Sequence, residues 1–95
     1  MLKEEIHVVF HGHVQGIGFR GVVKQYADQL DVHGFVRNMP DGSVEICAQA
    51  YQKDLQQLLD RLQKKFNRHI HHVDVEYRVL KTVYPDFQII RLGTV

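Results

Sequence analysis

Residues 10–20 form the stretch that decides the fold, Phe10-His11-Gly12-His13-Val14-Gln15-Gly16-Ile17-Gly18-Phe19-Arg20. The residues that lead into this stretch alternate between apolar and more polar, with the apolar ones at Ile6, Val8 and Phe10. A period of two residues is typical of a half-buried strand. After it, apolar residues recur at helical spacing at Val22, Val23, Tyr26, Ala27 and Leu30. We therefore predict a strand over residues 5–13, a glycine-rich connection, and a helix over residues 20–31.

The glycine-rich connection is a candidate anion-binding loop. Gly12, Gly16 and Gly18 lack a Cβ, so the backbone can adopt positive φ and turn several N–H groups into one small concavity. The first turn of the following helix adds partial positive charge, and the guanidinium of Arg20 can contact two phosphate oxygens at once. Strand-to-helix turns also carry glycine for geometry alone, and the spacing matches neither a P-loop nor a dinucleotide-binding fingerprint.

The composition is that of a small soluble protein. With 95 residues, 44% hydrophobic and 24% charged, the chain can enclose one modest core, and we expect a single domain over residues 1–95. The net charge of +1 predicts no nucleic-acid partner and no anionic membrane partner. A single cysteine cannot form an internal disulfide, and no stretch has the apolar length of a signal peptide or a membrane span. We expect a cytoplasmic monomer.

The middle of the chain predicts a hairpin followed by a helix. Residues 33–38 and 43–50 have strand patterns, and Met39-Pro40-Asp41-Gly42 between them has the residues of a tight turn. Residues 53–66 predict a second helix, whose apolar stripe is Leu55, Leu58, Leu59, Leu62 and Phe66.

The last third of the chain supplies two more strands. Alternation predicts a fourth strand at Val73, Val75, Tyr77 and Val79. Beyond Pro85, a short last strand or tail is marked by Phe87, Ile89 and Leu92. The order β-α-β-β-α-β predicts an α+β fold with a split β-α-β arrangement, in which two helices cover one face of an antiparallel sheet, plus the short C-terminal strand.

This topology brings two distant residues together. A right-handed crossover makes the second strand parallel to the first, and the third strand lies between them, antiparallel to both. The glycine-rich loop follows the first strand, and Asn38 ends the second. We therefore expect Arg20 and Asn38 at the same edge of the sheet, although 18 positions separate them (38 minus 20).

Two segments of the chain resemble the signatures of the acylphosphatase family. Residues 12–20 are similar to the first signature, and Gly34-Phe35-Val36-Arg37-Asn38, followed by Asp41-Gly42-Ser43-Val44-Glu45, is similar to the second. The end of the chain, at residues 87–91, also resembles the family. The likeness extends over nearly the whole chain in length and element order. It departs from the family pattern at His13, where arginine is common, at Ile17, where valine is common, and in the connection at residues 67–72.

The resemblance implies a small ferredoxin-like enzyme that hydrolyses acyl phosphates to a carboxylate and inorganic phosphate. Carried over, it implies that Arg20 binds the phosphate and Asn38 positions the attacking water. It also implies an amide cradle for the phosphate at Gln15, Gly16, Ile17, Gly18 and Phe19. No metal and no organic cofactor is implied. The chemistry suits these residues, because phosphoryl transfer is catalysed mainly by positioning and charge stabilisation, and an asparagine amide orients water without acting as a base.

Several other residues have a second interpretation. Histidines cluster at His69, His71 and His72 and alternate at His7, His11 and His13, but no carboxylate or cysteine completes a metal-binding set of defined spacing. His13 is either a polar surface residue or a proton relay, since histidine titrates near neutral pH. We expect Cys47 to be a small buried or half-buried side chain and not a nucleophile. Arg37 lies on the face opposite to Asn38, and we expect it to be a solvated surface charge.

Three rival functions belong to other classes. A sheet of this kind also serves as an RNA-binding platform, but the outward residues of the third strand, Ser43, Glu45, Cys47 and Gln49, offer no aromatic ring for stacking. Domains that resemble acylphosphatases also occur within larger carbamoyl-transfer proteins, where they act on carbamoyl phosphate; that this chain stands alone favours the free enzyme. A regulatory domain would bind phosphate or carbamoyl phosphate without hydrolysing it.

Overall fold

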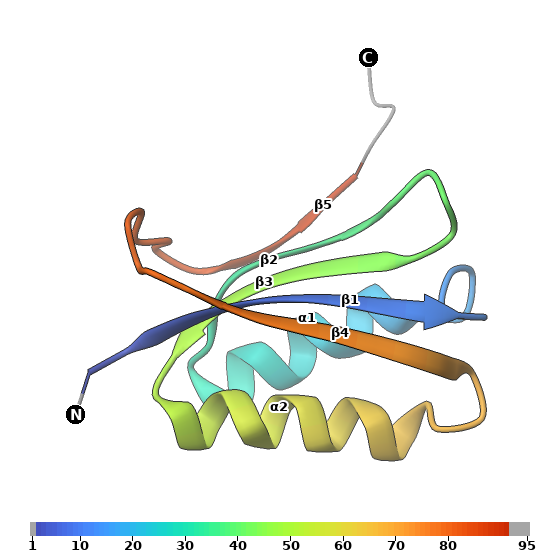
Figure 1. Cartoon of the computed structure of the whole chain (residues 1–95), viewed down its shortest axis with the longest axis horizontal. Helices are drawn as coiled ribbons and strands as arrows, with labels where there is room; N and C mark the ends of the chain where they lie inside the picture. The colour runs from blue at the N-terminus through green and yellow to red at the C-terminus, as the bar shows by residue number, and fades with distance from the viewer. Residues whose placement is uncertain (1, 92–95) are drawn as a thin grey trace.

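The computed structural model describes residues 2–91, which form two helices and a five-stranded sheet (Figure 1). In chain order the elements are β1 (Glu4–Gly12), α1 (Phe19–Leu30), β2 (His33–Asn38), β3 (Val44–Ala50), α2 (Gln52–Lys65), β4 (Ile70–Arg78) and β5 (Phe87–Ile90). Every element predicted from the sequence is present, and most ends shift by one residue. The exception is β4, which begins at Ile70, three residues before Val73, and ends at Arg78, so that Val79 lies outside it. Leu92, which we assigned to the last strand or tail, lies outside the described residues.

The strand order in the sheet is β4-β1-β3-β2-β5. β3 pairs antiparallel with both β1 and β2, and β4 pairs antiparallel with β1, as the split β-α-β arrangement predicts. β5 pairs parallel with β2, so the complete sheet is mixed. The reason is the connection at residues 79–86, which carries the chain from the β4 edge of the sheet to the opposite edge.

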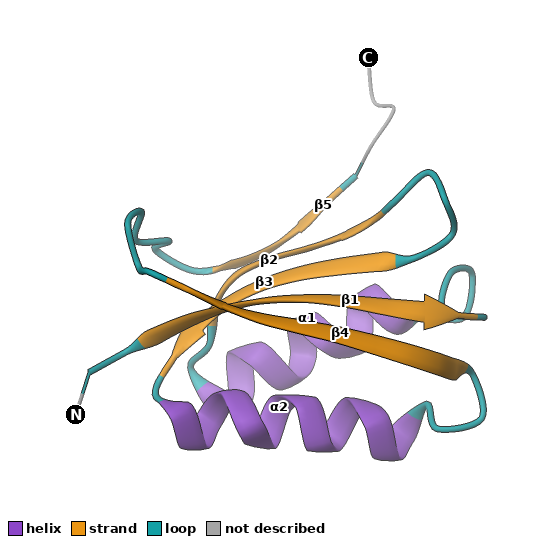
Figure 2. Cartoon of the chain, viewed as in Figure 1, coloured by secondary structure: helices purple, strands orange, loops and turns teal. Residues whose placement is uncertain are grey.

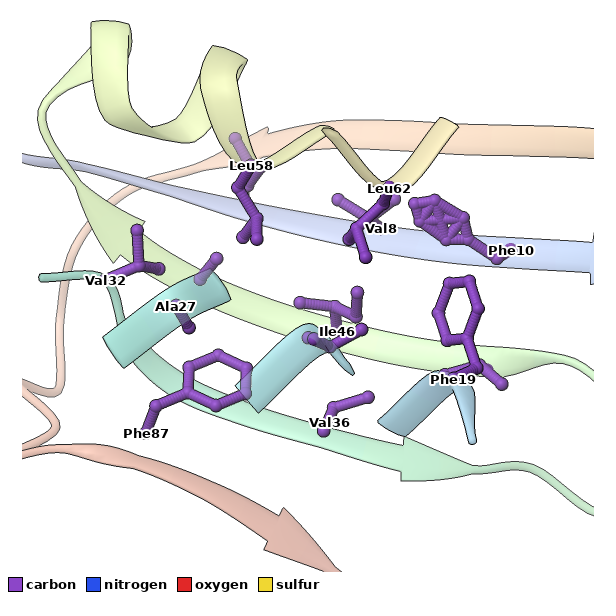
Figure 3. Close-up of a cluster of buried hydrophobic side chains, with 14 of the residues drawn as sticks. Val8, Phe10, Phe19, Ala27, Val32, Val36, Ile46, Leu58, Leu62 and Phe87 are labelled. Carbon is purple, nitrogen blue, oxygen red and sulfur yellow. The ribbon is translucent and has the colours of Figure 1, made fainter. Parts of the chain in front are cut away.

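Both helices cover the same face of the sheet, and the core lies between the two layers (Figure 2). Figure 3 shows side chains of both layers meeting there, among them Val8, Ile46 and Leu62. Phe19, the first residue of α1, packs edge-on against Phe10 with ring centroids 5.2 Å apart. Burying an aromatic side chain of this size contributes roughly 1.5–3 kcal/mol, so the start of α1 is held firmly to β1.

The opposite face of the sheet is partly covered by the connection at residues 79–86. The side-chain amide of Gln49 donates to Glu5 Oε1 at 2.7 Å and to the carbonyl oxygen of Thr82, and its oxygen accepts from the N–H of Tyr84 at 3.1 Å. This cover explains why Gln49, on the outward face of β3, is buried. Cys47 beside it is buried as well, as predicted, and burial raises the pKa of its thiol to about 11.

β4 is an edge strand, and the apolar residues in its alternating pattern are more exposed than those of β1. Val73 is partly buried against the core, but Val75 and Tyr77 are 44% and 56% exposed. They lie beside Val8 and Ile6 of β1, at the margin of the helix-covered face. Within residues 2–91, no helix is long and apolar enough to cross a membrane.

Candidate active site

The site begins with the loop between β1 and α1. Gly16 and Gly18 have φ of 78° and 81°, and Gly18 is the N-cap residue of α1. A Cβ built on either glycine meets no atom within 4 Å, so these positions require glycine for backbone conformation and not for space. No side chain caps α1, and its first turn holds no acidic residue. The amide groups of that turn lack acceptors within the helix, which makes this end of α1 suited to an anion.

A pocket of about 220 Å³ lies at this end of α1. Its lining residues are Val14, Gly16, Gly18, Phe19, Arg20, Gly21, Asn38, Ile89 and Arg91. Arg20 and Asn38 therefore line one pocket, as the topology predicts, together with part of the predicted cradle. Gln15 and Ile17, the other two cradle residues, do not line it. The side chain of Ile17 is 37% exposed, and that of Gln15 reaches the β2–β3 turn.

Asn38, the last residue of β2, has an unusual environment. Its Oδ1 is the one buried side-chain oxygen or nitrogen within residues 2–91 that has no hydrogen-bond partner. Leaving such an atom unpaired costs about 1–3 kcal/mol, so native proteins tolerate it mainly where function requires it. Asn38 lines the pocket, so its side-chain amide lies beside the space that a water molecule or substrate group would occupy.

The β2–β3 turn that follows Asn38 is fixed from two sides. Asp41 Oδ1 accepts hydrogen bonds from the N–H and the hydroxyl of Ser43, at 3.0 and 2.6 Å, and the hydroxyl bond is the main reason that the pKa of Asp41 is lowered. The side-chain nitrogen of Gln15 donates to the carbonyl oxygens of Met39 and Ser43, both at 2.8 Å. The loop that precedes Arg20 is thereby linked to the turn that follows Asn38. The family resemblance implies a place for Gln15 in the cradle, and no pattern in the sequence indicated this cross-link.

Two lining residues were missed by the sequence interpretation. Ile89 and Arg91 belong to the end of the chain, and no pattern in the sequence specifies which strand the last strand pairs with. The only available signal was the resemblance of residues 87–91 to the end of acylphosphatase chains. The parallel pairing of β5 with β2 brings this segment to the pocket, and Lys24 of α1 donates to the carbonyl oxygen of Phe87 at 2.9 Å.

Arg37 is not the solvated surface charge that we predicted. Its Nε donates to Glu45 Oε1, and His7 Nε2 lies 2.6 Å from Glu45 Oε2. The register of β2 and β1 against β3 places all three side chains on the face away from the helices. Burial alone would raise the pKa of Glu45, but the hydrogen bonds from His7 and Arg37 lower it below its ordinary value.

The remaining histidines lie outside the pocket. His11 and His72 both contact Asp74, at 3.0 and 2.7 Å, on the exposed surface of β1 and β4. The ring of His13 lies 5.8 Å from that of His71, and the N–H of His13 donates to the carbonyl of His69. Among the residues that the structure describes, no group of three or more histidine, cysteine or acidic side chains is arranged to hold a metal ion.

Comparison with known proteins identifies the family of the chain. A model of the acylphosphatase family matches residues 6–89. An acylphosphatase from Caldanaerobacter subterraneus subsp. tengcongensis is 32% identical over 89 residues, which are 93% of this chain and 99% of the relative. The crystal structure of acylphosphatase from Bacillus subtilis superposes with a TM-score of 0.83 at 26% identity, covering 92% of this chain and 98% of that one. Full-length HypF, in a phosphate- and nucleotide-bound form, matches with a TM-score of 0.81 at 26% identity, covering 96% of this chain but 12% of HypF.

Proposed function

The chain belongs to the acylphosphatase family, and from this premise we propose that the pocket between α1 and the end of β2 is its active site, with Arg20 and Asn38 in separate roles. The reaction is the hydrolysis of acyl phosphates, the mixed anhydrides of carboxylic and phosphoric acids. In the proposal, Arg20 and the amides of the loop and first helical turn hold the phosphoryl group, and Asn38 orients the attacking water.

The observation that carries this proposal is the shared pocket itself. Arg20 and Asn38 come from different elements, yet both line a pocket that the N-terminus of α1 also reaches. A guanidinium and fixed amide donors match the charge that spreads over the phosphoryl oxygens in the transition state. The Oδ1 of Asn38 has no hydrogen-bond partner within the described residues, and in the proposal it accepts a hydrogen bond from the attacking water. One pocket thus combines the groups that bind the phosphoryl group with a group that can orient water.

The proposed step needs no covalent intermediate, because an acyl phosphate is already activated. The water oxygen attacks phosphorus in line with the acyl oxygen. The bond between phosphorus and the acyl oxygen breaks, and its electron pair leaves on the carboxylate. Since an asparagine amide is no base at neutral pH, the proton of the water moves to a phosphoryl oxygen of the substrate itself. Arg20 stabilises the equatorial oxygens throughout, and the enzyme contributes position and charge.

The proposal extends to the state in which the enzyme works. We propose a monomer that works without a metal, an organic cofactor, a nucleic-acid partner or a membrane partner. The one thiol within residues 2–91 is buried and unpaired, so the fold has no need of an oxidising compartment, which supports a cytoplasmic location.

A phosphate- or carbamoyl-phosphate-binding module is the alternative, and it has less support. The likeness to HypF covers 12% of that protein, whereas the acylphosphatases from Caldanaerobacter and Bacillus subtilis match over 99% and 98% of their lengths. The two alternatives differ in turnover, because a binding module would hold phosphate without releasing a carboxylate.

The test is hydrolysis of benzoyl phosphate in water enriched in oxygen-18, with a metal chelator present. We expect turnover by the wild type, with the heavy oxygen appearing in inorganic phosphate because water attacks phosphorus. Arg20→Ala should raise KM and lower kcat, while an equally charged control, Arg68→Ala on the exposed connection after α2, should match the wild type. Label in benzoate, or full activity of Arg20→Ala, would contradict the mechanism. A folded wild type that binds phosphate without turnover would favour the binding module.

A further inference from the structure

The end of β5 brings a second guanidinium to the phosphate pocket. Arg91 lines the same pocket as Arg20 but belongs to the opposite end of the chain. We propose, on the basis of the proposed function, that Arg91 is a second phosphate-binding residue of this enzyme, which contacts the phosphoryl group from the Asn38 side while Arg20 contacts it from the α1 side.

The register of the sheet accounts for the position of Arg91. β5 runs parallel to β2, with Val36 beside Ile89 and Arg37 beside Ile90. Continued by one residue, this register places Arg91 next to Asn38. Side chains alternate between the two faces of a strand, and this alternation, continued by one residue beyond β5, places Arg91 on the same face as Phe87 and Ile89. Phe87 is buried in the core beneath that face, which is the face covered by the helices.

Contacts with α1 and with the core hold β5 in place. Phe87 is 1% exposed, and the Nζ of Lys24 on α1 donates to its carbonyl oxygen at 2.9 Å. Ile89 is half-buried, packs against the core and lines the pocket beside Arg91. Arg91 is therefore presented by a strand that is fixed both to β2 and to α1, which makes its approach to the pocket a property of the fold.

The charge of the pocket favours a phosphate contact. Two of the described residues that line it are arginines, and none of them carries a carboxylate. The N-terminal amides of α1 lie at the same pocket. An acyl phosphate carries up to two negative charges on its phosphoryl group, and arginine binds phosphate oxygens with two parallel hydrogen bonds. In an in-line attack the acyl group leaves on the side away from the water. The register places Arg91 beside Asn38, which is assigned to that water, so we expect Arg91 to contact the phosphoryl oxygens and not the acyl chain.

The test compares two substrates and one product. Benzoyl phosphate has an uncharged acyl group, succinyl phosphate has an acyl group with its own carboxylate, and inorganic phosphate is a competitive inhibitor without any acyl group. In Arg91→Gln we expect KM for both substrates and the inhibition constant of phosphate to rise together by about three- to tenfold, the range for one exposed charge-assisted contact. Arg91→Lys should fall in between, and the control Arg68→Gln, with the same loss of charge, should match the wild type.

Two results would overturn the proposal. One is an Arg91→Gln enzyme with wild-type constants. The other is a loss confined to succinyl phosphate, which would assign Arg91 to the acyl group. Thermal unfolding of each variant separates a binding defect from a folding defect, and a rise in all three constants that Arg91→Lys partly reverses identifies a charge contact. A wild type that hydrolyses neither substrate, but binds phosphate with an affinity that depends on Arg91, would contradict the proposed function and support this inference.

Discussion

The side-chain nitrogen of Gln15 lies 2.8 Å from the carbonyl oxygen of Met39, the residue that follows Asn38. The same nitrogen lies 2.8 Å from the carbonyl oxygen of Ser43, at the other end of the turn. One amide group thus joins the loop that leads to Arg20 with the turn that begins at Asn38. The two proposed catalytic residues belong to different elements, and these two hydrogen bonds join the segments beside them.

Replacing Gln15 should therefore impair turnover more than phosphate binding. In Gln15→Ala, both hydrogen bonds are lost and the turn after Asn38 is released, so we expect kcat to fall about tenfold, the equivalent of one or two partly buried hydrogen bonds. Gln15→Glu should be no better, because a carboxylate cannot donate to two carbonyl oxygens. Steady-state kinetics with phosphate inhibition checks this, with Gln25→Ala on the exposed side of α1 as the control. An unchanged kcat in Gln15→Ala would show that the link has no part in positioning Asn38.

Gly18 and Gly21 offer a matched pair in the same loop-to-helix segment. Neither has an atom within 4 Å of an added Cβ, but Gly18 has φ of 81°, whereas Gly21 lies inside α1. Gly18→Ala should destabilise the protein by about 1–2 kcal/mol and weaken phosphate binding, since the left-handed conformation is costly for alanine. Gly21→Ala should stabilise it by up to about 1 kcal/mol, because alanine is the better helix former.

Urea unfolding and phosphate inhibition of the two glycine variants would test this prediction. Equal stability of Gly18→Ala and Gly21→Ala would mean that the loop does not depend on the left-handed conformation at Gly18.

Glu45 should make stability depend on pH. Its pKa in the folded protein is lowered from the ordinary value of 4.5, with the hydrogen bonds from His7 and Arg37 outweighing the effect of burial. The unfolded chain therefore binds a proton at Glu45 more readily than the folded one. The stabilisation is complete above the unfolded pKa and is lost as the pH falls through the lower folded pKa.

Urea unfolding of Glu45→Gln, Arg37→Gln and the double variant would measure this effect. We expect Glu45→Gln to be less stable than the wild type at pH 7 and the difference to shrink toward pH 3. The double variant should lose less than the sum of the two single variants, because both remove the same ion pair. A difference between wild type and Glu45→Gln that does not change with pH would contradict the role assigned to the carboxylate.

The parts of the structure that followed from the sequence are those set by periodicity and chain connectivity. Alternation in β1 and β3 and the apolar stripe of α2 predicted a sheet covered by helices on one face. The rule that such crossovers are right-handed predicted that Arg20 and Asn38 lie at the same edge of the sheet. These inferences need only local patterns and a topological rule, which explains why they agree with the structure.

The features that sequence patterns did not reveal depend on pairing across the sheet. The ion pair between Arg37 and Glu45 arises from the register of β2 against β3, which no local pattern specifies. Val75 and Tyr77 alternate like the residues of a covered strand, but their strand lies at the edge of the sheet, where the helices give less cover. Arg91 reaches the pocket only because residues 79–86 carry the chain across to the far edge, beside β2.

The most direct test of the account is the kinetics of Asn38→Ala, measured with benzoyl phosphate and with inorganic phosphate as inhibitor. Asn38 is assigned to the water and Arg20 to the phosphoryl group, so removing the Asn38 amide should lower kcat by ~10²–10³, as for one preorganised donor or acceptor. The inhibition constant of phosphate should stay within about twofold of the wild type, as it should in the exposed control Asn67→Ala, because the phosphate site is intact. A folded Asn38→Ala enzyme with wild-type kcat, or one that loses phosphate binding and turnover together, would contradict the division of roles between the two residues.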